Sequence, residues 1–235
     1  MLCFNTIMNK QIIIHATKTI EALKSILSTS SLRLSYSSED FSIGTNKISS
    51  AAHPMVCFCE HNLAELDKKK ITYGRYGIAF SRDWSLQNRI SPVIYVDGNS
   101  LAAKGLATLL KARQNKMGKE LPKYLRLPIM EIKCFTKNVR GYNSYLNEQD
   151  FDFKNENEWR YVPRKSDING NLISQNQSTY LKNRERHNRK LLPYPLKFNM
   201  PDVEMVFVAT DSEVQQISSE FLIDSKKVQV SKWKT

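Results

Sequence analysis

Two short segments of this chain carry side chains that could bind and act on a nucleotide. The first is an apolar run, residues 11–17, that delivers His15 and Thr17 near its end. Because side chains alternate along a strand, both would project to the same face. In the second segment, residues 158–161, Glu158 and Arg160 flank a tryptophan. A neutral imidazole can hold a sugar hydroxyl, a carboxylate can stabilise developing positive charge, and a guanidinium can clamp paired phosphate oxygens.

The same residues also allow a purely structural interpretation. A histidine on an apolar strand is as often a satisfied core residue as a ligand. Glu158 and Arg160 stand two apart on a predicted strand, so they could simply pair with neighbours on one sheet face. Tyr73 and Tyr76, which lie beside glycines, could mark only a turn.

The charge of the chain is uneven along its length. The net charge is +12, and residues 104–140 hold ten Lys and Arg against two Asp and Glu. Residues 182–197 hold six against one, whereas residues 141–163 are locally acidic. This pattern favours a polyanion such as nucleic acid as a partner, with Lys104, Lys111, Arg113 and Lys116 as candidate contacts. The alternative is a solvated basic face without a ligand.

The cysteines and the hydropathy narrow the class of protein. Cys57 and Cys59 are two residues apart, which differs from the CxxC spacing of metal sites, so we expect reduced thiols and no metal centre. No apolar run approaches the roughly 20 residues that a membrane span needs. The first ten residues lack the apolar stretch of a signal peptide, so we expect a cytoplasmic protein.

Hydrophobic periodicity predicts an α+β fold in a single domain, residues 1–235, with a mixed or antiparallel sheet and flanking helices. Residues 35–50 are expected to form a polar loop over the site, and residues 164–190 a polar, basic surface insertion. The predicted strands are 11–17, 54–59, 76–80, 92–96, 129–136, 159–162, 203–209 and 227–230, and the predicted helices are 19–27, 63–70, 100–117 and 211–221.

Several blocks, taken in order, resemble the AbiGi family of bacterial abortive-infection proteins. They are PMVCFC at residues 54–59, YGRYGIAF at 73–80 followed by Trp84, PVIYV at 92–96, and EWRYVP at 158–163. The resemblance covers roughly residues 10–165. It implies a phage-defence role as the antitoxin-labelled half of a two-component system whose partner is a nucleotidyltransferase-like protein.

A second similarity, to DarT-like ADP-ribosyltransferases, suggests a chemistry. It rests on His15-Ala16-Thr17 followed by a predicted helix. It implies an ADP-ribosyltransferase-like fold with NAD as substrate, in which His15 holds the ribose and Tyr73 or Tyr76 stacks on nicotinamide. Thr17, on the same face of the strand as His15, is a further candidate for binding NAD. Glu158 would stabilise the oxocarbenium character of the ribose as the nicotinamide bond breaks.

A pyrophosphate clamp completes the expected NAD site. Arg75 or Arg160 would hold the two phosphates, because a guanidinium matches paired phosphate oxygens. If this site exists, His15 and Glu158 should line one cleft, with Tyr73 or Tyr76 on its wall.

The leading hypothesis is therefore a phage-defence enzyme that transfers ADP-ribose from NAD to a macromolecule, with a nucleic acid favoured by the net charge. The alternative is a non-enzymatic antitoxin or regulator that binds a partner protein or RNA. A nuclease is disfavoured, because the sequence shows no Asp and Glu pair at metal-binding spacing.

Overall fold

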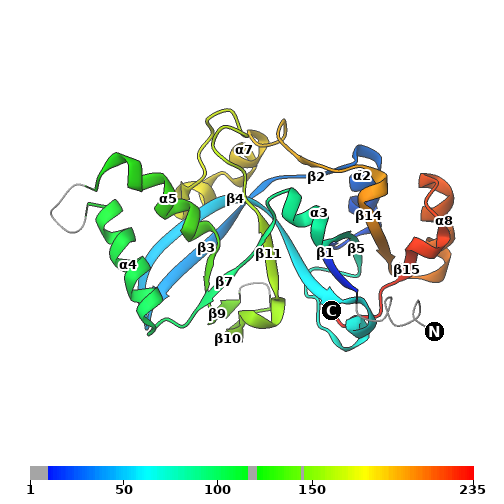
Figure 1. Cartoon of the computed structure of the whole chain (residues 1–235), viewed down its shortest axis with the longest axis horizontal. Helices are drawn as coiled ribbons and strands as arrows, with labels where there is room; N and C mark the ends of the chain where they lie inside the picture. Colours follow the sequence, from blue (N-terminus) through cyan, green and yellow to red (C-terminus); the bar gives the residue numbers. More distant parts are fainter. Residues whose placement is uncertain (1–9, 116–120, 144–145) are drawn as a thin grey trace.

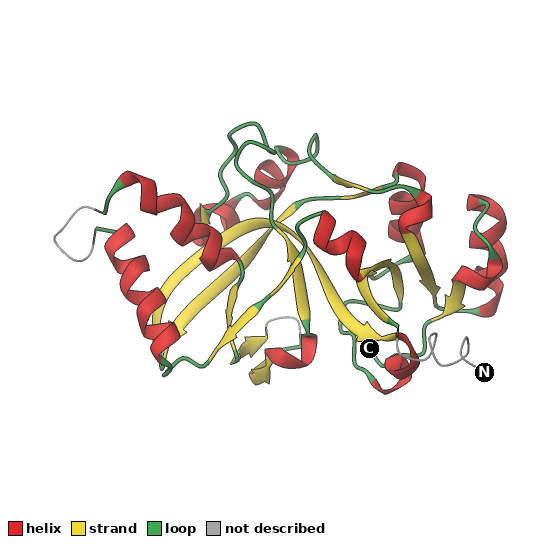
Figure 2. Cartoon of the chain, in the orientation of Figure 1, coloured by secondary structure: helices red, strands yellow, loops and turns green. Residues whose placement is uncertain are grey.

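A computed structural model describes residues 10–115, 121–143 and 146–235 of the chain. Its largest sheet is mixed and runs β15-β14-β5-β1-β4-β11-β6, with β3 and β12 also paired to β4. The β14–β15 pair is parallel, and the other pairs in this sheet are antiparallel. Helices flank the sheet (Figures 1 and 2), so the predicted α+β class with a mixed sheet is confirmed.

The large sheet is built from β1 (Gln11–Thr17), β3 (Ser35–Ile43), β4 (Asn46–Asn62), β5 (Tyr76–Ser81), β6 (Ser91–Pro92), β11 (Glu158–Tyr161), β12 (Gln175–Asn176), β14 (Val203–Val208) and β15 (Val228–Val230). Shorter pairs are β2 (Ser31–Leu32) with β13 (Leu196–Lys197), β7 (Ile94–Val96) with β8 (Thr136–Asn138), and β9 (Arg140–Asn143) with β10 (Glu148–Asp152). The α-helices are α2 (Ile20–Thr29), α3 (Arg82–Gln87), α4 (Leu101–Arg113), α5 (Lys123–Cys134), α6 (Gln177–Lys182), α7 (Arg184–Arg189) and α8 (Asp211–Phe221). Four 3-10 turns are η1 (Leu63–Lys68), η2 (Phe153–Glu156), η3 (Met200–Asp202) and η4 (Ser225–Lys227).

The first strand and helix form where the periodicity predicts them. Helix α2 starts because the Thr19 side chain accepts a hydrogen bond from the Ala22 backbone N–H, which satisfies a donor that the first turn leaves free. It ends at Ser30, whose backbone is left-handed with φ 44°. Leu23 and Leu27 face the core, so α2 packs its apolar side inward.

The expected loop at residues 35–50 is wrong, because this segment belongs to a long β-hairpin. Strands β3 and β4 pair from Ser35 with Met55 to Ile43 with Asn46, and Gly44 turns the chain with φ +53°. Tyr36 and Phe41 are buried, whereas most of the intervening polar side chains reach solvent. Ser and Asn are weak strand formers, and the pairing partner overrides their local preference.

The predicted strand at residues 129–136 is also wrong, since most of it lies in helix α5. Ile129, Met130, Lys133 and Cys134 are buried, and their spacing follows the helical repeat. Pro128 lies inside the helix, which weakened the helical signal in the sequence. Strand β8 follows only at Thr136.

The register of the sheet decides which side chains share a face. Directly opposed residues of paired strands point to the same side. Ile14 pairs with Cys59, and Cys59 pairs with Glu158 on its other side, so these three residues share one face. Ile13 and Phe58, each one residue away, belong to the opposite face, where the larger hydrophobic cluster packs.

The two ends of the molecule carry different helices (Figure 1). Helices α4 and α5 contact each other, and α4 also contacts the β3–β4 hairpin. Helices α2 and α8 lie together near β14 and β15 at the other end. Strand β4 is the element that the two halves share.

Residues 164–190, expected as a surface insertion, contain β12, α6 and α7. Ile168, Ile173 and Tyr180 within it are buried in the larger cluster. In the described part of the chain, no helix is both long and apolar enough to cross a bilayer.

Candidate functional site

A buried network of charged side chains crosses the large sheet on the face that carries Glu158. Arg160 is fully buried and donates through Nε to Glu158 Oε1 (2.7 Å) and through Nη2 to Glu158 Oε2 (2.9 Å). Its Nη2 also donates to Glu39 Oε1 on β3 (2.8 Å), and its Nη1 to the Cys134 carbonyl (2.7 Å). The guanidinium therefore ties β11 to β3 and to the end of α5.

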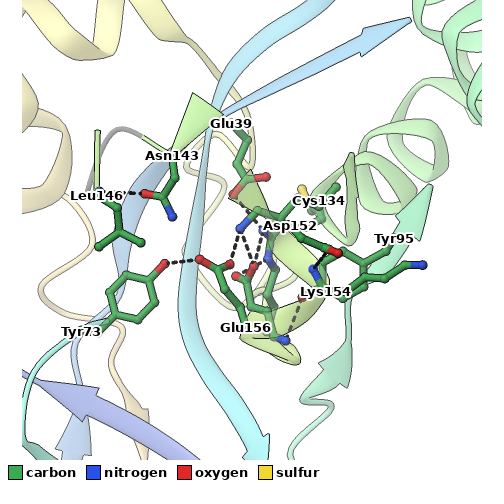
Figure 3. Close-up of polar contacts among 12 residues, drawn as sticks. Glu39, Tyr73, Tyr95, Cys134, Asn143, Leu146, Asp152, Lys154 and Glu156 are labelled. Atoms are coloured by element: carbon green, nitrogen blue, oxygen red, sulfur yellow. Dashed lines mark hydrogen bonds and ion pairs between the residues drawn. The ribbon is translucent and has the colours of Figure 1, made fainter. Parts of the chain in front are cut away.

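Lys137 extends this network toward the surface. Its ammonium donates to Glu158 Oε2 (3.0 Å) and to Glu156 Oε2 (2.7 Å) and lies 4.2 Å from the centre of the Phe153 ring. Tyr73 donates its hydroxyl to Glu156 Oε1 (3.2 Å), so its ring stands at the outer end of the network (Figure 3). Glu156 thus links the buried charges to an exposed aromatic ring.

The two glutamates differ in their electrostatics. Burial by itself would raise the pKa of Glu158, but the charges of Arg160 and Lys137 outweigh it and lower the pKa to about 2. Burial raises the pKa of Glu156, and Lys137 opposes that shift only in part. Burial would lower the pKa of Lys137, but the surrounding carboxylates raise it. The neighbouring cations therefore favour the ionised form of Glu158, whereas burial favours protonation of Glu156.

A cleft of about 690 Å³ opens beside the outer end of the network. Tyr73 and Glu156 line it, together with the three lysines of residues 68–70 and with Asp150 and Asp152 of β10. Glu158 and Arg160 are not among the described residues of its lining. The cleft thus meets the network at Glu156, and the carboxylate of Glu158 stays beneath it.

His15 does not reach this site, and the expectation that it shares a cleft with Glu158 is wrong. It follows Ile14 on β1 and therefore points to the opposite face of the sheet from Glu158. Its ring packs edge-on against Phe58 (5.6 Å between centroids), and its Nδ1 lies 2.9 Å from the Cys57 carbonyl. Burial lowers the pKa of His15, which favours a neutral, structural imidazole.

The other residues predicted to bind NAD do not join Glu158 in one site. Thr17 pairs with Tyr76 where β1 meets β5, and the Tyr76 hydroxyl donates to Glu213 at the start of α8 (2.9 Å). Arg75 is exposed in the preceding turn. Of the two tyrosines, only Tyr73 lines the cleft of Glu156. The predicted site is therefore divided between two faces, with His15, Thr17 and Tyr76 on one face of the sheet and Glu158 and Arg160 on the other.

Arg160 does not match the expected pyrophosphate clamp. Its side chain has no solvent-exposed surface, and its three nitrogens donate to protein oxygens. A ligand would first have to displace two carboxylates. The physical reason is that Arg160 points to the same side as Glu158, two residues away on one strand, as the structural interpretation predicted.

The basic residues proposed for nucleic acid lie near the end of the molecule formed by α4 and α5. Lys104 and Lys111 are exposed on α4. Arg113 is half-buried and donates through Nε to the Arg126 carbonyl (3.1 Å). Lys116 lies outside the described residues.

Two members of the network could not be singled out from the sequence. Glu39 lies in the segment interpreted as a loop, so its inward position depends on the β3–β4 pairing. Lys137 lies on β8, which the structure pairs with β7. In the sequence, the two-residue spacing of Glu156 and Glu158 is the feature that indicates that both carboxylates could bind one cation.

Fold and site together define a mixed α+β protein with a buried ion-pair network on one face of its large sheet. The chain belongs to the AbiGi family, because the family model for abortive phage resistance protein AbiGi, antitoxin, matches residues 30–209. The family resemblance of the sequence blocks is thereby confirmed.

A curated relative supports the same family. The chain is 26% identical over 127 residues to an abortive phage resistance protein AbiGi of Lactococcus lactis subsp. cremoris, covering 47% of this chain and 51% of the relative. The chain thus spans about half the length of the curated relative it matches. No solved structure matches the chain, so an ADP-ribosyltransferase-like fold stays a prediction.

Proposed function

We propose that this protein acts in abortive phage resistance as a non-enzymatic antitoxin that binds and neutralises a partner toxin. The family description supports the antitoxin role. The partner expected from the family resemblance is a nucleotidyltransferase-like protein. We therefore favour the non-enzymatic antitoxin, which was the alternative hypothesis from the sequence, over the ADP-ribosyltransferase.

The observation that carries the choice is the state of Glu158. Its two carboxylate oxygens accept three hydrogen bonds from Arg160 and Lys137 and are buried beneath the cleft. Stabilising a ribose cation requires a carboxylate that faces the sugar. The opposite orientation of His15 removes the second member of the catalytic pair.

The competing hypothesis, transfer of ADP-ribose from NAD, would have to use the carboxyl group that does line the cleft. The NAD hypothesis requires a carboxyl group and an aromatic ring in one cleft, and Glu156 and Tyr73 meet in this cleft. Replacement of Glu156 by glutamine keeps the size and hydrogen-bonding capacity of the side chain and removes its charge. The Glu156→Gln variant therefore distinguishes the two functions without opening the Arg160 pair.

The test is co-expression of the partner toxin with wild-type protein or with Glu156→Gln, scored by growth and phage plating at matched protein levels. In parallel, purified wild type is incubated with radiolabelled NAD and total RNA, DNA and protein. We expect both proteins to neutralise the toxin and neither to consume NAD. Consumption of NAD by wild type that Glu156→Gln abolishes would establish the enzyme instead.

A further inference from the structure

A second pocket lies among β4, the end of α4 and α5, which are elements at one end of the molecule (Figure 1). It has a volume of about 490 Å³ and is bounded by residues 47–51 of β4, the end of α4, Met130 of α5 and residues 174–176. Its side chains include Lys47, Arg113, three serines and three carboxamides, with no Asp or Glu among the described lining residues. Two of these donors, Lys47 and Ser50, are bound to the Asp40 carboxylate, so Arg113 supplies the charge available to a ligand in the described lining.

Arg113 supplies positive charge that no carboxylate offsets. Arg113 Nε donates to the Arg126 carbonyl (3.1 Å), and Arg126 Nη2 donates to the Arg113 carbonyl (3.3 Å). Within the described residues, neither guanidinium forms an ion pair with an acid. Burial lowers the pKa of Arg113, and the charge of Arg126 lowers it further. Two like charges held side by side favour a bound anion.

A buried lysine, Lys133, lies on the same helix as Met130 of the pocket lining, and burial lowers its pKa. Lys133 lies one helical turn after Met130, and its ammonium is fully buried without a hydrogen-bond partner in the described structure. Lys133, Arg160 and Arg113 all lower the pKa of His53, so the three charges act on the same region. The two carboxylates that raise the pKa of Lys133 are engaged elsewhere, since Glu39 binds Arg160 and Asp40 binds Lys47 at 2.7 Å.

We propose that this pocket binds a phosphate group carried by a larger organic molecule, with Arg113 as the principal contact. A guanidinium presents paired N–H donors that match two phosphate oxygens, and carboxamide and hydroxyl groups can complete the shell. The pocket is larger than a phosphate ion, which leaves room for an attached sugar. The phosphate could belong to a free nucleotide or to the backbone of a single-stranded nucleic acid.

Three ligands distinguish the sources of the phosphate. The whole chain is titrated calorimetrically with AMP, with adenosine, and with a single-stranded RNA of about ten nucleotides. We expect AMP or the RNA to bind and adenosine not to bind, because the phosphate supplies the contact. Tight binding of AMP identifies a nucleotide site, whereas binding of the RNA alone identifies a nucleic-acid site.

Arg113→Gln and Lys123→Gln provide the matched pair of variants. Each removes one positive charge, Arg113 from the end of α4 and Lys123 from the start of α5, but Lys123 is exposed and does not line the pocket. We expect Arg113→Gln to raise the Kd of the phosphorylated ligand by about tenfold or more and Lys123→Gln by less than about twofold. Thermal unfolding of each variant checks that it folds, and Arg113→Lys, which keeps the charge and loses the fork, should bind with intermediate affinity.

Two outcomes would overturn the proposal. Equal losses in Arg113→Gln and Lys123→Gln would mean that ligands meet only a general basic surface. Absence of saturable binding of AMP and RNA to wild type at millimolar concentration would mean that the pocket holds no phosphate. Neither outcome bears on neutralisation of the toxin, so this inference can fail while the proposed function stands.

Discussion

At the scale of single residues, Arg160 is the side chain on which most of the buried charge depends. It is fully buried and faces both Glu39 and Glu158. A buried ion pair adds little net stability by itself, but removal of one partner leaves an uncompensated charge inside the protein. Removal of the Arg160 side chain is therefore expected to destabilise the folded protein.

Arg160→Ala should lower the free energy of unfolding by about 3–5 kcal/mol, because the buried carboxylates of Glu39 and Glu158 lose their hydrogen bonds to the guanidinium and Glu158 keeps only Lys137. The control is Arg140→Ala, which removes an exposed pair with Asp150 (2.7 Å) and should change stability by less than about 1 kcal/mol. Urea denaturation followed by circular dichroism measures both. Equal effects of the two substitutions would contradict a structural role for the network.

His53 should make the stability of the protein sensitive to acid. Burial and the charge of Lys133 lower the pKa of His53 to about 3, against an ordinary value of 6.5. The unfolded chain therefore binds a proton as pH falls from 6.5 toward 3, while the folded protein does not. The contribution of neutral His53 to the free energy of unfolding is fully present above pH 6.5. It is lost as pH falls from 6.5 toward 3, and the free energy of unfolding then decreases by about 1.4 kcal/mol per pH unit.

The measurement is the free energy of unfolding at pH values between 7 and 4 for wild type and His53→Gln. We expect the variant to be less stable at pH 7 and to show a shallower decline toward pH 4. Some decline should persist, since burial also lowers the pKa of His61, to about 4. Parallel curves for the two proteins would exclude His53 as a source of the pH dependence.

At the scale of elements, β4 holds the site together. It pairs with β1 and β11 near its end and with β3 and β12 nearer its start. Glu39 lies on β3 and Glu158 on β11, and these two strands pair with different stretches of β4. Arg160 forms hydrogen bonds to both glutamates. The turn that presents Tyr73 to the cleft must in turn lie close against the end of β1.

Gly74 allows that close approach. Its φ is +122°, and a Cβ added there would lie 2.2 Å from the Thr17 carbonyl oxygen. Gly74→Ala should therefore cost about 3 kcal/mol or more, through both the backbone conformation and the clash. Gly44→Ala is the control, because Gly44 also has positive φ (+53°) but open space around it, so about 1 kcal/mol is expected. Thermal denaturation of both variants checks the difference, and similar midpoints would exclude the clash.

At the scale of the whole molecule, charge is separated along the chain and in space. The acidic segment around β10 and η2 lines the first cleft, together with the lysines of residues 68–70. The second pocket, at the end with α4 and α5, lacks carboxylates among its described lining residues. A net charge of +12 keeps nucleic acid a reasonable class of ligand, and binding through Lys104 and Lys111 stays a prediction.

Local sequence was enough to predict the bounds of elements whose hydrophobic periodicity matches the way they are buried in the fold. The predicted strand at residues 11–17 and the predicted helix at 211–221 have the observed bounds of β1 and α8. Helix α8 is set by a capping box in which Thr210 and Glu213 bond each other's backbone N–H groups, an interaction that spans three residues. Such a short-range interaction can be predicted from the sequence without knowledge of the tertiary structure.

Only the tertiary structure decided which residues meet. Alternation along a strand places His15 and Thr17 on one side, and Glu158 and Arg160 on one side, but says nothing of how the two strands align. The register of β4 with β1 and β11 sets that relation, and a shift by one residue would reverse it. The pairing of β3 with β4 likewise brought Glu39 to Arg160 from a segment whose composition favours a loop. Sequence therefore determined the members of each face, and long-range strand pairing determined that the histidine and the glutamate point apart.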